Sequence, residues 1–254
     1  MLKCVVINGS PHKGNTYELA KIVMNRMHEC GATIEEIHLG QHKIPFCSGC
    51  FSCFERGEDA CPHHDAVKPI AQAIESADAL IVLTPAYSLA PTALLKNMID
   101  HLSYYFHRPR FFGRKALVLS TTAGAGAKAC TGYIRNVLGH WGFGRVYTYA
   151  LACFAALGYT PSAKAEKRLD HLAGCLVRDI KNGRTPRVRL KRVMYYNAWR
   201  AMAAVHPESI DGHYWHDSGL ARTAFAPQIK LGLIGRLFGA LMFRLIKFSM
   251  VKFS

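Results

Sequence analysis

The sequence predicts an α/β fold, with a doubly wound five-stranded parallel sheet and a basic helical C-terminal extension. Two observations predict the sheet: five strand-like segments alternate with five helix-like ones, and most of the strand-like segments are apolar runs typical of buried strands. A third observation predicts the extension, because the positive charge is concentrated near the end of the chain. We expect a domain over residues 1–183 and the extension over 184–254.

The strands differ in their patterns. LKCVVING, at 2–9, reads as a buried strand, whereas ATIEEIHL, at 32–39, alternates apolar and polar residues. The other three are β-rich apolar runs, expected at 78–87, 115–126 and 144–153.

The segments between the strands carry apolar residues at helical spacing. Pro91 is compatible with the first turn of the third helix, and Gly183 marks the end of the fifth. The helices are expected at 14–29, 65–77, 91–105, 127–142 and 162–183.

In such a sheet, ligands bind outside the carboxyl ends of the strands, near the topological switch point. A ligand is therefore expected beside the loops that begin at residues 8, 39, 84 and 121. The second loop runs from 39 to 64, and a loop of that length inside a compact domain tends to be functional.

The first loop, NGSPHKGNT, opens the first helix. A helix amino terminus offers unpaired N–H groups and a positive dipole end, which together favour a phosphate. Gly9 and Gly14 allow the backbone to approach an anion closely. The side chains that could contact the anion are Ser10, His12, Asn15 and Thr16. The alternative is an ordinary loop in which Asn15 or Thr16 caps the helix.

The third and fourth loops provide space for a flat ring. Pro85 and Tyr87 form a stiff, partly apolar wall at a strand end, where we expect backbone N–H groups to face a ligand. The next strand ends in TTAGAGAKA, whose glycines permit close contact. A phosphate cradle between two such walls suits a mononucleotide with a planar ring.

The segments NGSPHKGNT, TPAYSLAPTALLKNMIDH and LSTTAGAG resemble the FMN-contacting loops of the flavodoxin-like NAD(P)H-dependent FMN reductase family. The resemblance covers roughly residues 1–180 and implies a flavodoxin-like domain, FMN as cofactor, NAD(P)H as electron donor and a homodimer. It implies phosphate contacts from Ser10, His12, Asn15 and Thr16. Along the isoalloxazine it implies Pro85, Ala86, Tyr87 and Ser88, with Thr121, Thr122, Ala123 and Gly124 at the other edge.

Ala86 departs from the family pattern, in which a bulkier residue usually follows the proline. A flavodoxin-like scaffold that has lost its cofactor is therefore one alternative. No residue is assigned as catalytic, because Tyr87, His12 and His101 are candidates by residue type only.

Four cysteines fall in the stretch CSGCFSCFERGEDAC, at Cys47, Cys50, Cys53 and Cys61. The amino terminus carries no apolar signal-peptide core, so we expect a cytoplasmic protein with reduced thiols. Close spacing of cysteines then favours metal or redox chemistry. The spacing C-x2-C-x2-C-x7-C is similar to the motif of the iron–sulfur flavoproteins, a branch of the same family, which implies a [4Fe–4S] cluster on these four thiols.

Three alternatives to the cluster stay open: a zinc site, a redox-active CxxC disulfide and an inherited loop that binds nothing. The expected function is an FMN-dependent NAD(P)H oxidoreductase that passes electrons to a quinone, flavin or protein acceptor. The alternative is a membrane-tethered flavin electron carrier that a partner protein reduces.

The basic character belongs mainly to the tail. Residues 181–254 contain 13 Lys and Arg against three acids, a net of +10 out of +15. Such a charge suggests an anionic partner, either a membrane surface or nucleic acid. No reading motif accompanies the charge, so nucleic acid is the weaker candidate. Residues 206–219 interrupt the helical pattern, and we expect a loop packed on aromatic side chains.

The last segment, 229–254, reads as a helix without acidic residues. At about 100° per residue, its five cations fall within about 160° and the opposite face is apolar. Its charge-free run from 237 to 243 is much shorter than the roughly 20 residues that span a bilayer. The helix is therefore expected either to lie on an anionic membrane at the inner face or to pack its apolar face on protein.

Overall fold

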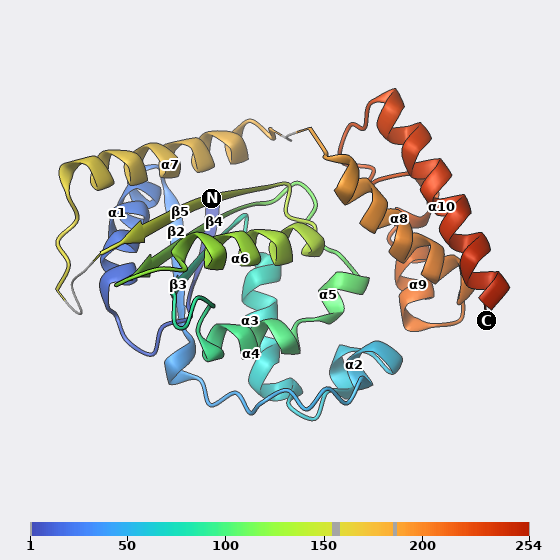
Figure 1. Ribbon diagram of the computed structural model, residues 1–254, viewed down its shortest axis with the longest axis horizontal. Helices are drawn as coiled ribbons and strands as arrows, with labels where there is room; N and C mark the ends of the chain where they lie inside the picture. The colour runs from blue at the N-terminus through green and yellow to red at the C-terminus, as the bar shows by residue number, and fades with distance from the viewer. Residues whose placement is uncertain (1, 154–157, 185–186, 254) are drawn as a thin grey trace.

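A computed structural model describes residues 2–153, 158–184 and 187–253 (Figure 1). Residues 1 and 154–157 of the expected domain, and 185–186 and 254 of the expected extension, lie outside the described residues. The sheet has five parallel strands in the order β2-β1-β3-β4-β5, which confirms the predicted fold class. The strands are β1 (Leu2–Asn8), β2 (Ala32–His38), β3 (Ala79–Pro85), β4 (Lys115–Thr122) and β5 (Arg145–Ala152).

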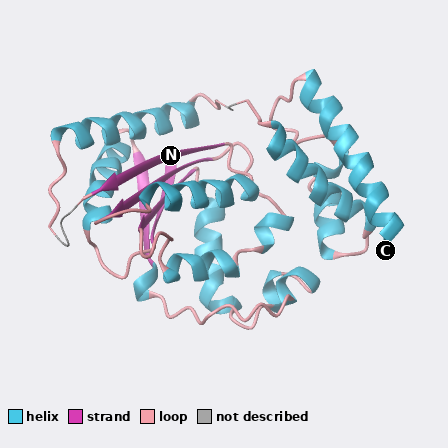
Figure 2. Ribbon diagram, viewed as in Figure 1, coloured by secondary structure: helices cyan, strands magenta, loops and turns pink. Residues whose placement is uncertain are grey.

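Two helical layers cover the sheet (Figure 2). Helices α1 (Asn15–Glu29) and α7 (Ala163–Lys181) pack on one face. The opposite face is covered by α3 (His64–Ser76), α4 (Ala93–His101) and α6 (Ala127–Trp141). Side chains along β1 alternate between the two apolar cores, as expected for a strand buried on both faces.

The helix expected at 91–105 is wrong in its extent, because the chain turns at Leu102 and Ser103. Helix α4 ends there, and a short helix α5 (Tyr104–His107) follows. The turn directs Tyr105 into the core, where its ring centroid lies 4.9 Å from that of Phe111 and 5.2 Å from that of Trp141. The burial of this aromatic cluster is the tertiary reason for the break.

The C-terminal region comprises α8 (Leu190–Val205), α9 (Ile210–Asp217) and α10 (Leu233–Phe253). Its own apolar core contains Tyr196, Trp215 and Phe225. The prediction of a loop over 206–219 is wrong, since α9 lies within it. The Ser209 hydroxyl caps α9 by accepting from the Gly212 N–H at 3.0 Å.

The C-terminal region docks on the end of α5 and on the residues that follow it. Trp215 donates its indole N–H to the carbonyl of His107 at 2.8 Å, and the Tyr214 hydroxyl donates to the carbonyl of Pro109 at 2.7 Å. The guanidinium of Arg108, 1% exposed, pairs with Asp211 of α9. Burial by itself raises the pKa of Asp211, but the hydrogen bond from His107 and the charge of Arg108 lower it overall.

Helix α10 packs one face on α8 and leaves another exposed (Figure 1). Gly239 lies against Ala224 and Asn197, and Arg200 lies 4.2 Å from the ring centroid of Phe243. Seven large apolar side chains stay exposed along the helix, and we call them the α10 stripe: Leu233, Ile234, Leu237, Leu241, Leu245, Phe248 and Val251. The sequence predicts that the apolar face of this helix meets either a membrane or protein. That face packs on α8 of the same chain, whereas the α10 stripe lies on the solvent-exposed side together with the cations.

In the described part of the chain, no helix is both long enough and apolar enough to span a bilayer.

We predict that Asp211→Asn lowers the free energy of unfolding by about 3 kcal/mol at about pH 7, because it breaks a buried ion pair. The pKa of Asp211 is lowered in the folded protein. Its stabilisation is therefore complete above roughly pH 4 and is lost as the pH falls through the folded pKa. Urea unfolding at about pH 7 and about pH 3 measures both effects.

Asp217→Asn is the control, because its side chain, at the end of the same helix, is 76% exposed. We expect it to change the free energy of unfolding by less than about 0.5 kcal/mol. Equal effects of the two substitutions would contradict a specific role for the Arg108–Asp211 pair.

Candidate functional site

The amino terminus of α1 forms the first wall of the site. Gly14 is the N-cap residue and supplies no side-chain cap. The alternative in which Asn15 or Thr16 caps the helix is therefore wrong, because both lie inside it. A helix start whose N-cap is a glycine without a side-chain cap is suited to an anion, because the backbone can approach the anion closely there.

The four side chains expected around a phosphate differ in their surroundings. Ser10 is buried, and its hydroxyl accepts from the His12 N–H at 3.3 Å. His12 itself is exposed. The Asn15 carboxamide turns toward the end of β5, with its nitrogen 3.6 Å from the Cys153 sulfur, and the Thr16 hydroxyl lies 2.5 Å from that of Thr121. The roles of the four side chains at a phosphate stay predictions.

The turn after β3 forms the second wall. Tyr87 and Ala90 exchange backbone hydrogen bonds of 2.9 and 3.0 Å across a tight turn. The two residues between them, Ser88 and Leu89, have φ of 49° and 67°. Positive φ at non-glycine residues costs roughly 1–3 kcal/mol each and is typical of functional sites. The strained turn holds Tyr87 half exposed at the carboxyl end of the sheet.

The expectation of ligand-facing backbone N–H groups is wrong for two residues of this wall. The N–H of Ala86 donates to the Thr121 carbonyl at 2.8 Å, and that of Tyr87 donates to Ala90. What this wall offers is therefore the Tyr87 ring and the backbone of the turn.

The loop after β4 closes the other side. Thr121 and Thr122 are buried, whereas Ala123 and Gly124 are exposed. The Thr122 hydroxyl accepts from the Gly124 N–H at 3.2 Å and donates to the Ala125 carbonyl at 2.8 Å, which shapes a tight loop.

The three loops contact one another. The Thr92 hydroxyl at the start of α4 donates to the Gly9 carbonyl at 2.5 Å, and Ala86 is bonded to Thr121. A Cβ on Gly9 would lie 2.8 Å from the Leu95 Cβ and 3.0 Å from the Leu83 carbonyl oxygen, so only glycine fits here. We call this arrangement the three-loop crevice. Its uncapped helix start and its aromatic wall fit a phosphorylated planar cofactor.

The second loop, residues 39–64, carries the four cysteines, and we call it the cysteine loop. It packs on α4. Asn97 accepts from the Cys47 N–H at 3.0 Å and donates to the carbonyls of Ile44 and Pro45 at 3.2 and 3.0 Å. His101 lies 2.8 Å from the Pro45 carbonyl and 3.8 Å from the Cys61 sulfur. Sequence reasoning missed Asn97 as an anchor. Its spacing of four residues from His101 on one helix face is the signal that points to it.

The four thiols differ in exposure. Cys47 and Cys50 are exposed, and Cys53 and Cys61 are half-buried. Hydrogen bonding with Ser52 lowers the pKa of the Cys50 thiol, whereas burial raises that of Cys53 to about 11. Across the described residues, no three Cys, His, Asp or Glu side chains gather in the geometry of a formed metal site.

A cavity of about 310 Å³ lies beside Cys53 and Cys61. Arg108 donates to the Cys53 carbonyl at 2.6 Å and contacts Glu58 at 3.4 Å, so the loop is attached to the segment that holds α9. Arg110 pairs with Glu58 and also with Glu75 at 2.6 Å. These two arginines hold the second half of the cysteine loop in place. No pattern in the sequence indicated that Arg108 and Arg110 would contact this loop.

The sequence profile of the NADPH-dependent FMN reductase family matches residues 2–155, more than half of the chain. The chain belongs to this family. The matched region contains the three-loop crevice and the whole cysteine loop.

Individual relatives agree with this assignment. An iron–sulfur flavoprotein of Archaeoglobus fulgidus is 34% identical over 143 residues, which cover 56% of this chain and 64% of the relative. An iron–sulfur flavoprotein of Methanocaldococcus jannaschii is 35% identical over 100 residues, 39% of this chain and 51% of the relative. The chain thus spans less than two thirds of these curated relatives.

Solved structures share the fold. One is an FMN-dependent NADH-azoreductase of Bacillus anthracis in complex with FMN, which superposes with a TM-score of 0.55 at 17% identity. The superposition covers 70% of this chain and 100% of the azoreductase chain. An NADH:FMN oxidoreductase in its apo form gives a TM-score of 0.53 at 22% identity, covering 70% of this chain and 90% of that one.

Proposed function

We propose that this protein is an FMN-dependent NAD(P)H oxidoreductase that passes electrons to a quinone, flavin or protein acceptor. The observation that carries the proposal is the three-loop crevice, which combines a helix start without a side-chain cap and a strained turn beside Tyr87 in loops that are bonded to one another. Membership of the NADPH-dependent FMN reductase family supports the same cofactor and donor.

In this proposal the chain binds and orients FMN. The α1 amino terminus with Ser10 and His12 holds the phosphate, and Thr16 with Asn15 shapes the cradle from inside the helix. Pro85, Ala86, Tyr87 and Ser88 lie along the ring, with 121–124 at its other edge. When bound, FMN supplies exchange of two electrons with a reduced nicotinamide and their release together or singly.

We predict that the full-length protein, purified anaerobically, shows flavin absorption and oxidises NADH or NADPH with a quinone or free FMN.

Gly9→Ala is expected to weaken FMN binding by about tenfold, because the new Cβ would clash with Leu95 and push the loop that holds the phosphate out of position. Flavin titration by fluorescence measures the affinity.

Gly174→Ala on α7 is the control, since a Cβ there meets no atom within 4 Å. A colourless protein that takes up no FMN would contradict the proposal and favour the scaffold without cofactor. Flavin that only a partner protein can reduce would favour an electron carrier instead.

We further propose that Cys47, Cys50, Cys53 and Cys61 hold a [4Fe–4S] cluster. The proposal is supported by the anchoring of their loop on α4, which also carries Thr92 of the crevice. Iron–sulfur flavoproteins among the relatives point to the same group. A cubane cluster needs four thiolates, and short spacings allow one loop to enclose it.

We predict about four iron and four sulfide per chain after anaerobic purification or reconstitution. Cys53→Ala should lower both contents, because it removes a central ligand. The matched control is Cys175→Ala, a half-buried thiol on α7 outside the loop. Stoichiometric zinc, or equal iron contents in the two variants, would rule out the proposed ligands.

We also propose that the α10 stripe rests on an anionic membrane, which would make a tethered electron carrier the second candidate function. The observation in its favour is that large apolar side chains, among them Leu237 at 63% and Leu241 at 53% exposure, share the outer side of α10 with lysines and arginines. Such a surface inserts between anionic headgroups and attracts them by charge. A peripheral position at the inner face of the membrane would follow.

We predict that the protein co-sediments with vesicles containing phosphatidylglycerol and much less with neutral vesicles. Leu241→Glu should reduce binding about tenfold, because it places a carboxylate within the stripe. Leu190→Glu, on an α8 side chain 45% exposed, is the control. Protein that stays in the supernatant with anionic vesicles would exclude this role.

The domain boundary at 183 and the homodimer stay predictions.

A further inference from the structure

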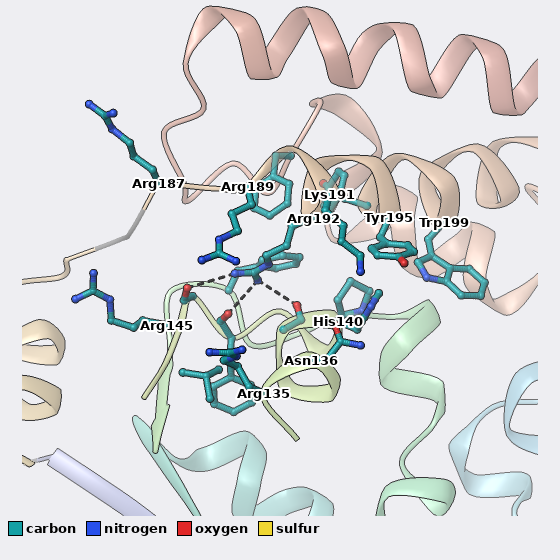
Figure 3. A pocket seen from close by; sticks show the side chains of 18 of the residues that line it. Arg135, Asn136, His140, Arg145, Arg187, Arg189, Lys191, Arg192, Tyr195 and Trp199 are labelled. Atoms are coloured by element: carbon teal, nitrogen blue, oxygen red, sulfur yellow. Dashed lines mark hydrogen bonds between the residues drawn. The ribbon is translucent and has the colours of Figure 1, made fainter. Parts of the chain in front are cut away.

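A second cavity of about 440 Å³ lies between the sheet domain and the C-terminal helices. Its floor is the end of α6 and the start of β5, and its other wall is the first half of α8 (Figure 3). Because the strands are parallel, the start of β5 lies at the opposite edge of the sheet from the three-loop crevice. A strand of eight residues spans about 25 Å, so the two sites are separate.

The cavity is strongly cationic. Among its described lining residues there is no carboxylate, while six cations line it: Arg135, Arg145, Arg187, Arg189, Lys191 and Arg192. Where the structure describes the chain, Arg145 alone among these cations has an ion pair, with Asp179 at 2.8 Å. Charges gathered without acidic partners repel one another, so a bound anion would relieve that repulsion.

Arg192 is the innermost of these cations. It donates to the carbonyls of Phe143 at 2.9 Å and Gly139 at 3.1 Å, which completes the end of α6. Burial lowers its pKa, and no carboxylate is among its partners. Within the described residues its positive charge therefore faces backbone carbonyls and the Phe225 ring, 6.0 Å away, rather than a carboxylate, and contributes to the potential of the cavity.

Arg135 and Arg189 are different, because both are exposed and their guanidinium groups make no hydrogen bond or ion pair within the described residues. Figure 3 shows Arg189 reaching from the start of α8 toward Arg192, with Arg135 below it on α6. Guanidinium groups that converge from two elements are suited to bidentate contact with phosphate oxygens.

The other end of the cavity is aromatic. The half-buried rings of His140, Tyr195 and Trp199 lie together on the side of the view away from Arg145 and Arg187 (Figure 3). The ring centroids of His140 and Tyr195 are 4.5 Å apart. Burial, with the charges of Arg192 and Lys191, lowers the pKa of His140, which therefore stays neutral and able to stack at neutral pH.

We propose that this cavity binds a nucleoside polyphosphate, with the phosphates at the arginine end and the base at the aromatic end. Several unpaired cations require a multiply charged anion, and the adjacent rings provide the surface on which a base stacks. The volume is within the range of small-ligand sites. Because the ligand would contact both α6 and α8, its binding fastens the C-terminal helices to the sheet domain.

Calorimetric titration of the FMN-saturated full-length protein with ATP, inorganic triphosphate and adenosine tests this proposal. We expect ATP to bind at least about tenfold more tightly than triphosphate or adenosine. The double variant Arg135→Ala/Arg189→Ala should weaken ATP and triphosphate by at least about tenfold, because each lost contact is a charge-assisted hydrogen bond. Tyr195→Ala should weaken ATP and leave triphosphate unchanged.

The matched control is Lys167→Ala/Arg222→Ala, which removes two exposed cations that do not line the cavity. It should change ATP affinity by less than about twofold. Equal loss in both double variants would mean general attraction by net charge and would overturn the proposal. ATP binding that the cavity variants leave intact would place the nucleotide elsewhere, and equal affinity for ATP and triphosphate would exclude recognition of the base.

Discussion

The buried guanidinium of Arg108 is the interaction on which the arrangement of the parts depends. It is 1% exposed and has three partners on two segments: the Cys53 carbonyl and Glu58 in the cysteine loop, and Asp211 on α9. A buried charge is tolerated only where partners surround it, and removing one partner is costly. Arg108 therefore holds the cysteine loop and the C-terminal region in fixed positions around the end of α5.

Helix α4 performs a similar function between the two proposed redox centres. Its N-cap residue, Thr92, is bonded to Gly9 of the crevice, and its middle and end hold the cysteine loop through Asn97 and His101. A single rigid helix thus joins the crevice to the loop. Electron transfer between a flavin and a cluster depends on such a fixed separation, which flexible loops alone could not maintain.

The charge of the chain has two separate locations in the structure. Part of it lies on the outer side of α10 beside the exposed stripe, and part lines the cavity between α6 and α8. The first is an outer surface of the C-terminal helices, and the second lies where α8 faces Arg135 of α6 and Arg145 of β5. The concentration of lysine and arginine near the end of the sequence therefore corresponds to two surfaces with different chemistry.

The sheet, its helical layers and the positions of the crevice loops could be predicted from the sequence, because apolar periodicity and strand-end glycines are local signals. It also determined which cysteines share one loop. Only the fold shows the break at Leu102 and Ser103, the helix at 210–217 and the faces of α10, because Tyr105 and Trp215 are buried among distant partners and Phe243 packs against Arg200. The same holds for Arg108 and Arg192. An arginine in a sequence looks like a surface cation, and only the fold shows which carbonyls and carboxylates surround it.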